Sequence, residues 1–178
     1  KRYLGDRADG LPATALLFPL ALRIPGAEHR QVVRTVLATD EASQSMTFAG
    51  DVPEGSMAQL MRASFERLVD GAEAAAEHAA TVAPFTQTNG GGAPECAEDE
   101  PVLAIAISCV GRRLVLGRHV EDELEATYSA LPGRPTMVGF YSYGEICQVG
   151  LGQCDLHNQT MTVTTFRERR ARHLHEAA

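Results

Sequence analysis

The feature that most constrains the fold is a stretch of helical periodicity between Ser56 and Val82. Ser56 is followed three residues later by Gln59, a capping-box pattern that indicates the start of a helix. Apolar side chains then recur every three or four residues, which places them along one side of an α-helix. These side chains are Met61, Phe65, Leu68, Ala72, Ala75 and Ala79. The sequence therefore predicts one long helix that begins near Ser56 and ends near Val82.

Strands are predicted on both sides of this helix, where short apolar runs are bounded by turn residues. We expect strands at residues 15–23, 32–39, 46–52, 102–108, 136–143 and 160–166. Pro19 lies inside the first run, which indicates an edge position or a break near it. Residues 102–108 are apolar nearly throughout, a pattern typical of a central strand that is covered on both faces.

A second helix is expected at residues 120–131, because apolar side chains share one side and Pro132-Gly133 ends the run. The apolar residues are Val120, Leu124, Tyr128 and Leu131. The element order is then β-β-β-α-β-α-β-β. Strands grouped in runs, with two long helices, indicate an α+β fold in which both helices pack on a mostly antiparallel or mixed sheet.

A chain of 178 residues has the length of a single domain. Residues 84–100 carry Asn89-Gly-Gly-Gly92, prolines and acidic side chains, so they cannot bury enough apolar surface to become ordered. We expect a flexible loop there, inside one domain that spans residues 1–168. Residues 169–178 form an arginine-rich tail, which is more typical of a solvated helix or linker than of a nucleic-acid arm.

The charge and the cysteines narrow the possible partners and the compartment. A formal net charge of −7 disfavours binding to nucleic acid and to acidic membranes. No apolar stretch approaches the roughly 20 residues that a membrane helix needs. Cys96, Cys109, Cys147 and Cys154 follow no signal peptide, so we expect reduced thiols and a cytoplasmic location. The chain begins at Lys1 and not at methionine, which indicates a piece of a longer protein.

The first candidate site lies where the strand at 102–108 ends and small and cationic residues follow at once. If a helix begins at Val110, the amides of Val110 and Gly111 together with Arg112 would form a site for a carboxylate or phosphate. Cys109 would then have a lowered pKa and be partly thiolate. The equally supported alternative is a small buried cysteine with the arginines on the surface.

Two further candidates lie toward the C-terminus. Tyr141 and Tyr143 share one side of a strand that leads into Glu145, and together they could hold an amine or a planar ring. The alternative is ordinary core packing with bonded hydroxyl groups. His157, Asn158, Gln159 and Thr160 are four consecutive hydrogen-bonding residues, which indicates either a bound polar ligand or a loop tied to the backbone.

Three blocks in these regions resemble the signature segments of the FIST C-terminal domain: ISCVGRRLVLG at 107–117, GFYSYGEI at 139–146 and LHNQTMTVTTF at 156–166. The opening segments LGDRADGLPATALLFPLAL, VVRTVLATDE and FAGDVPEGS are also similar to that family. The resemblance implies a prokaryotic signalling protein in which an N-terminal FIST domain precedes this one. It further implies sensing of small ligands such as amino acids, with histidine kinases, diguanylate cyclases or phosphodiesterases as partners. Some members with FIST domains are haem-containing nitric oxide sensors.

The leading hypothesis is a binding domain without catalytic activity, whose ligand changes the arrangement of the two halves. The expected contacts come from Cys109, Val110, Gly111, Arg112, Tyr141, Tyr143, Glu145, His157, Asn158 and Thr160. One alternative is a haem or metal sensor, with His157 or Cys109 as the haem ligand, or with Cys147, Cys154 and His157 around a metal. Another is an enzyme with Cys109 as nucleophile, His157 as base and Glu145 orienting the base.

Overall fold

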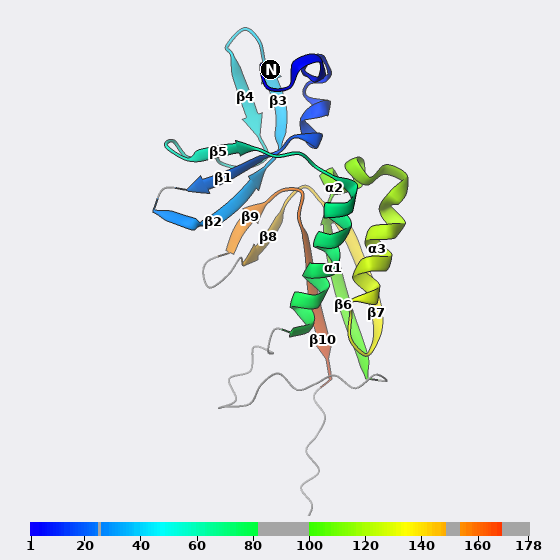
Figure 1. The fold of residues 1–178 in the computed structure, drawn as a ribbon. Coiled ribbons are helices and arrows are strands. Elements are labelled where there is room, and N and C mark those ends of the chain that lie inside the picture. Colours follow the sequence, from blue (N-terminus) through cyan, green and yellow to red (C-terminus); the bar gives the residue numbers. More distant parts are fainter. Residues whose placement is uncertain (25, 82–99, 149–153, 169–178) are drawn as a thin grey trace, which may run out of the picture.

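The computed structural model describes residues 1–24, 26–81, 100–148 and 154–168. The predicted loop at 84–100, except Glu100, and the predicted tail at 169–178 lie outside the described residues, as does Cys96. The chain forms two parts that meet near the middle of the molecule, with small sheets at one end and a helix-covered sheet at the other (Figure 1).

The N-terminal part contains a three-stranded antiparallel sheet in the order β2-β1-β5 and a β3–β4 hairpin. Two 3-10 helices precede it, η1 (Gly5–Gly10) and η2 (Ala13–Leu17). The strands are β1 (Leu20–Ile24), β2 (Ala27–Arg34), β3 (Val36–Asp40), β4 (Ser45–Phe48) and β5 (Met57–Leu60). Pro19 marks the break between η2 and β1, so the first predicted strand begins five residues later than expected.

The C-terminal part contains a second three-stranded sheet in the order β10-β6-β7, with a β8–β9 hairpin beside it. Its helices are α1 (Phe65–Thr81), α2 (Val110–Leu116), η3 (Gly117–His119) and α3 (Val120–Ser129). Its strands are β6 (Pro101–Cys109), β7 (Arg134–Ser142), β8 (Glu145–Gln148), β9 (Cys154–His157) and β10 (Met161–Arg167). β6 and β7 are parallel, and the helices α2 and α3 make the crossover between them. The predicted α+β class with a mixed sheet is confirmed.

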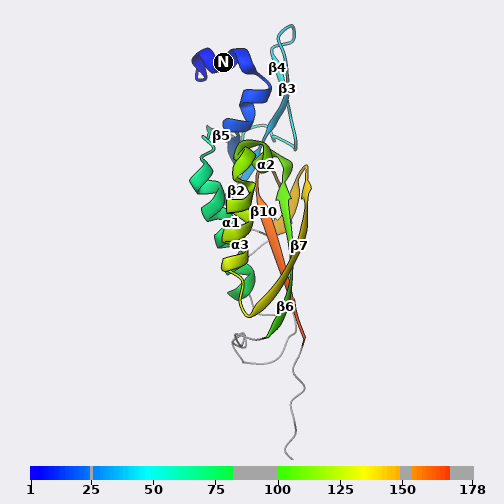
Figure 2. The same cartoon turned by 90° about the vertical axis from the view of Figure 1, so that its right-hand side faces the viewer.

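Helices α1 and α3 lie against the same face of this sheet (Figure 2). The core between these helices and the sheet contains several alanines, whose small side chains let the helices approach the strands closely. It contains Ala72, Ala76, Ala104, Ala106, Leu131 and Met161, with Met137 and Val163 packed against them. Gly139 of β7 is needed for the close approach to β6, because a Cβ atom there would lie 2.0 Å from the carbonyl oxygen of Ala106.

The predicted start of the long helix is wrong. Residues 57–60 pair with β1 as strand β5, and α1 begins only at Phe65. Ser64 takes the capping role that the pattern assigned to Ser56, since its Oγ accepts from the amide of Arg67 at 3.4 Å. A capping box is a local signal, and here the hydrogen bonds to β1 outweigh it.

The burial expected for β6 and α3 is also wrong. Burial alternates along β6, so the described residues cover one face of this strand and leave Leu103 on the other face exposed. On α3 the buried side chains are Glu123 and Thr127, whereas Leu124 and Tyr128 are exposed. The polar side of α3 faces inward because Glu123 has a buried cationic partner.

Candidate functional site

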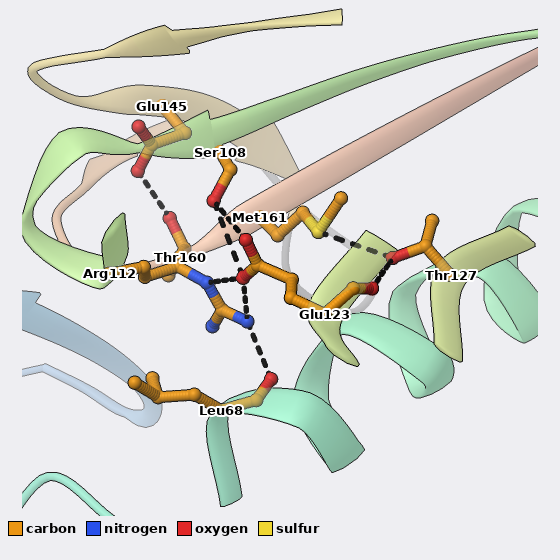
Figure 3. A network of polar contacts seen from close by, with 8 residues as sticks. All are labelled: Leu68, Ser108, Arg112, Glu123, Thr127, Glu145, Thr160 and Met161. Carbon is orange, nitrogen blue, oxygen red and sulfur yellow. Dashed lines mark hydrogen bonds and ion pairs between the residues drawn. The ribbon is translucent and has the colours of Figure 1, made fainter. Parts of the chain in front are cut away.

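A buried ion pair lies where β6 ends and α2 begins (Figure 3). Arg112 is 4% exposed and Glu123 is fully buried, and Arg112 Nε donates to Glu123 Oε1 at 2.7 Å. The hydroxyl of Ser108 donates to the same carboxylate at 3.2 and 3.4 Å. Arg112 Nη2 also donates to the carbonyl oxygen of Leu68 at 2.5 Å. The guanidinium of Arg112 on α2 thus joins the first turn of α1 to α3, and Glu123 on α3 joins this group to β6 through Ser108.

This geometry changes the role expected for Arg112. A buried charge is tolerated when it is paired and hydrogen-bonded, and here Arg112 pairs with Glu123 and also donates to the carbonyl of Leu68. The interpretation that both arginines lie on the surface holds for Arg113, which is exposed, and not for Arg112. Arg112 is therefore engaged within the protein, where the sequence predicted a contact with a ligand anion.

The predicted anion site at the start of α2 is covered by other parts of the chain. The side chain of Gln159 comes within 3.1 Å of the position that a Cβ atom would take at Gly111, and Leu16 of η2 comes within 3.7 Å. Val110 is half-buried and Gly111 is buried. The amides at this helix start lie beneath these side chains and not at an open surface.

A second buried carboxylate, Glu145, lies close to the first (Figure 3). It accepts hydrogen bonds from the hydroxyls of Ser142 at 2.6 Å and Thr160 at 2.8 Å. The carbonyl of Thr160 in turn accepts from the amide of Cys109 at 3.0 Å. His157 is the cross-strand neighbour of Glu145 and is also buried. The fold therefore brings together four residues that the sequence analysis named as candidate contacts: Cys109, Glu145, His157 and Thr160.

The predicted lowering of the Cys109 pKa is wrong. Burial raises the pKa of this thiol by more than the hydrogen bonds from the amides of Gln159 and Gly111 lower it, and the nearby carboxylate of Glu145 adds a smaller rise. Cys109 is 3% exposed. The thiol is thus held in its neutral form, which is the opposite of an activated nucleophile or a thiolate ligand.

The two tyrosines differ in their exposure. Tyr141 is half-buried, and the guanidinium of Arg113 lies 5.0 Å from its ring centroid. Burial and the charge of Glu123 raise the pKa of the Tyr141 hydroxyl. Tyr143 is 86% exposed, because β7 ends at Ser142 and the chain turns before β8. The two tyrosines that the sequence predicted around one ligand therefore have different surroundings.

Asn158 and Gln159 tie the C-terminal strands to the N-terminal sheet. Asn158 Oδ1 accepts from the amide of Thr35 at 3.4 Å, and Asn158 Nδ2 donates to the carbonyl of Tyr143 at 3.3 Å. Gln159 Nε2 donates to the carbonyl of Leu16 at 2.9 Å. These contacts favour the interpretation of this polar run as a loop anchor.

Arg34, which sequence reasoning missed, completes this anchor. Its Nη1 donates to the carbonyl of Leu156 at 2.7 Å, and its Nε donates to the carbonyl of Asp51 at 2.8 Å. The close approach leaves no room at Gly50, where a Cβ atom would lie 3.0 Å from Nε. Nothing in the local sequence around Arg34 indicates this role, because its partners lie far away along the chain.

An open cleft of about 700 Å³ lies between the N-terminal sheet and the start of α1. Its lining residues are Ala21, Gln31, Gln59, Leu60, Met61, Arg62, Ala63, Ser64, Phe65 and Arg67. None of these is acidic. In the described ranges neither Arg62 nor Arg67 has an ion-pair partner. Sequence reasoning missed this cleft, because it assigned residues 59–64 to the first turns of the helix, whereas they form the end of β5 and its connection to α1.

The model of the FIST C domain matches residues 1–148, which is most of the chain. The chain belongs to the FIST C family. FIST C domains are sensory domains of signal-transduction proteins, where each is one half of a FIST domain pair. Comparisons with curated proteins and with solved structures give no match. Among the described helices of this FIST C domain, none is both long enough and apolar enough to cross a membrane.

The residues expected to bind haem or a metal do not fit such a group. Cys109 and His157 are each 3% exposed, so a haem could reach them only if the surrounding strands separated. Burial raises the pKa of Cys147, which disfavours the thiolate that a metal needs. Within the part of this FIST C domain that the structure describes, no three His, Cys, Asp or Glu residues are grouped as metal ligands.

Proposed function

We propose that this FIST C domain binds a small anionic or zwitterionic metabolite, such as an amino acid, in the cleft at the start of α1. The observation that carries the proposal is a pair of guanidinium groups, Arg62 and Arg67, that have no ion-pair partner among the described residues and line a concave surface without acidic residues. The volume of about 700 Å³ lies within the range of about 300–1,000 Å³ that is typical of small-molecule sites. No catalytic step is part of the proposal.

The chemistry of the lining fits a ligand with a carboxylate and an apolar or amphipathic body. Arginine binds carboxylates through two parallel hydrogen bonds, and two arginines concentrate positive potential in a chain whose net charge is −7. The amide side chains of Gln31 and Gln59 supply both donors and acceptors for an ammonium or hydroxyl group. The side chain of Phe65 adds an apolar wall.

The cleft is connected to the buried ion pair through α1. Phe65 and Arg67 line the cleft, and the carbonyl of Leu68 in the same helical turn accepts from Arg112. A ligand that moves the start of α1 would therefore alter the contact between Arg112 and Glu123. Because a ligand shifts an equilibrium only by its different affinities for two states, α1 is the element that has to take up two positions.

The residues predicted from the sequence then divide into two roles. Those in the interior transmit the movement of α1 to the strands and do not touch the ligand. They are Cys109, Gly111, Arg112, Glu145, His157, Asn158 and Thr160, with Val110 beside them. Tyr141 and Tyr143 lie nearer the surface, at the carboxyl end of β7 and beyond it. What supports this division is that Arg112, Glu145 and Asn158 already have partners inside the protein.

A thermal-unfolding screen with amino acids and small carboxylates tests the proposal. A ligand at about 100 times its dissociation constant adds about 2.7 kcal/mol, which raises the midpoint of a domain of this size by about 5–10 °C. We expect this shift to be lost in Arg62→Ala and Arg67→Ala and kept in Arg113→Ala. Loss of the shift in Arg113→Ala alone would move the site to the carboxyl ends of β6 and β7. A midpoint unchanged by every compound would contradict ligand binding by this domain.

A further inference from the structure

The face of the β10-β6-β7 sheet that points away from α1 and α3 has no covering layer among the described residues (Figure 2). The strand register places three side chains from each strand on this side, in adjacent rows. We call this surface the outer face. It consists of Leu103, Ile105, Ile107, Thr136, Val138, Phe140, Thr162, Thr164 and Phe166.

The outer face has the composition of a protein interior. It holds six apolar side chains and three threonines, and it holds no ionisable group, although 22% of the chain is charged. The exposed fractions are 42% for Leu103, 52% for Val138, 60% for Phe140 and 52% for Phe166. Contiguous apolar patches of this kind on soluble proteins mark interaction sites.

The sequence of β6 independently indicates a second covering layer. A strand that is apolar on both sides is typical of a sheet buried on both faces, and 102–108 shows this pattern. The helices cover the side that carries Ala104 and Ala106, and they leave the side of Leu103, Ile105 and Ile107 open. Among the described residues, the sheet therefore has helices on one face and no second layer on the other face.

We propose that the outer face is the docking surface for the other domain of the FIST pair. The absence of ionisable groups favours a permanent partner, because permanent interfaces are more apolar than transient ones. A domain in the same polypeptide has an effective concentration of about 1 mM or more, far above that of a second copy of this chain. The partner surface is expected to be apolar as well, since burying a charge against this face would leave the charge unpaired.

This surface gives the proposed sensor a route from the ligand to the partner domain. Along β6, Ser108 points toward the helices and bonds to Glu123, whereas its neighbour Ile107 lies on the outer face. The strand is a single layer between the ion pair that holds α1 and the surface that holds the partner. The docking proposal rests on the FIST domain pair and not on ligand binding in the cleft, so each proposal can fail without the other.

Thiol labelling tests the docking surface. A two-domain FIST protein with this chain as its C-terminal half is compared with this chain alone, using Thr164→Cys on the outer face and Leu114→Cys on α2 as the matched control. Leu114 is 63% exposed and lies on the helical side. We expect Thr164→Cys to react at least about tenfold more slowly in the two-domain protein than in the isolated chain, whereas Leu114→Cys reacts equally in both. Modification is measured for each cysteine peptide by mass spectrometry.

A second substitution identifies the cause of the protection. Phe140→Glu places a charge in the middle of the outer face, so we expect it to restore the fast labelling of Thr164→Cys in the two-domain protein. Equal labelling of Thr164→Cys in the two proteins would overturn the proposal. Protection that disappears on dilution of the two-domain protein would also overturn it, because the occupant would then be a second copy. The screen for ligands uses this chain alone, so its result is independent of this one.

Discussion

Replacing Arg112 by methionine should be among the most destabilising single changes in the described structure. Methionine keeps much of the apolar stem of Arg112 but removes the charge that neutralises Glu123. Glu123 is fully buried, and it would retain only the hydroxyl of Ser108 at 3.2 Å. Removing one partner of a buried ion pair costs about 3–5 kcal/mol. Domains of this kind have a total stability of about 5–15 kcal/mol, so the loss is a large share of it.

The expected change in the unfolding midpoint follows from the size of the domain. A loss of 1 kcal/mol lowers the midpoint by about 2–4 °C at this length, so Arg112→Met should lower it by about 6–20 °C. Urea unfolding followed by circular dichroism gives the free energy directly, and the slope against urea concentration should stay unchanged. An unchanged slope would show that the same surface is exposed on unfolding.

Two comparison variants decide whether loss of the buried ion pair causes the destabilisation of Arg112→Met. Arg113→Met removes an exposed cation that lies over the ring of Tyr141, and it should cost less than about 1 kcal/mol. The double variant Arg112→Met with Glu123→Leu removes both charges, and it should recover most of the lost stability. If Arg112→Met destabilises no more than Arg113→Met, the reasoning from a buried and dehydrated ion pair is refuted.

Three further changes test other parts of the structure. Gly139→Ala should lower the free energy of unfolding by about 2 kcal/mol or more, because its Cβ atom would collide with the backbone of β6. Gly71→Ala inside α1 should raise the free energy of unfolding by about 0.5–1 kcal/mol, because alanine loses less backbone entropy than glycine in a helix. Urea unfolding measures both effects. Iodoacetamide should modify Cys154, which is exposed, and leave Cys109 unmodified until the chain unfolds. Because the pKa of Cys109 is raised in the folded chain, the unfolded chain loses the thiol proton first as the pH rises. The free energy of unfolding should therefore fall above the usual thiol pKa of about 8.5. Cys109→Ala should reduce that fall. Asn158→Ala should cost about 1–3 kcal/mol in the same assay, since it leaves the buried amide of Thr35 without its acceptor.

The class of the fold could be predicted because it depends on periodicity. The apolar repeat through Leu68 and Ala72 does form the buried side of α1, and the run at 102–108 does form the central strand of its sheet. Where α1 begins could not be predicted, because Ser56 and Ser64 are both followed by residues that suit a first helical turn. The pairing of 57–60 with β1 decides between them, and this contact is not local in the sequence.

The interior of the candidate site could be predicted only in part. The sequence named Cys109, Glu145, His157 and Thr160 for the chemistry of their side chains, and it did not indicate the strand pairing that brings them together. Glu123 could not be found in this way. Hydrophobic periodicity assigns a glutamate to the solvent side of a helix, and only the burial of Arg112 in the fold reverses that assignment.

The burial of β6 differs from the prediction, and the difference supports the proposed docking surface. The sequence predicts a strand covered on both faces, whereas the described residues cover only one. Both observations hold if the second cover comes from the other domain of the FIST pair. The alternation of side-chain size along β6 then has a physical reason. The side chains on the inner face are small because helices lie against them, and they are Ala104, Ala106 and Ser108. The side chains on the outer face are large because they contact a separate domain, and they are Leu103, Ile105 and Ile107. A ligand that moves α1 would thus act on the partner domain across the thickness of one strand.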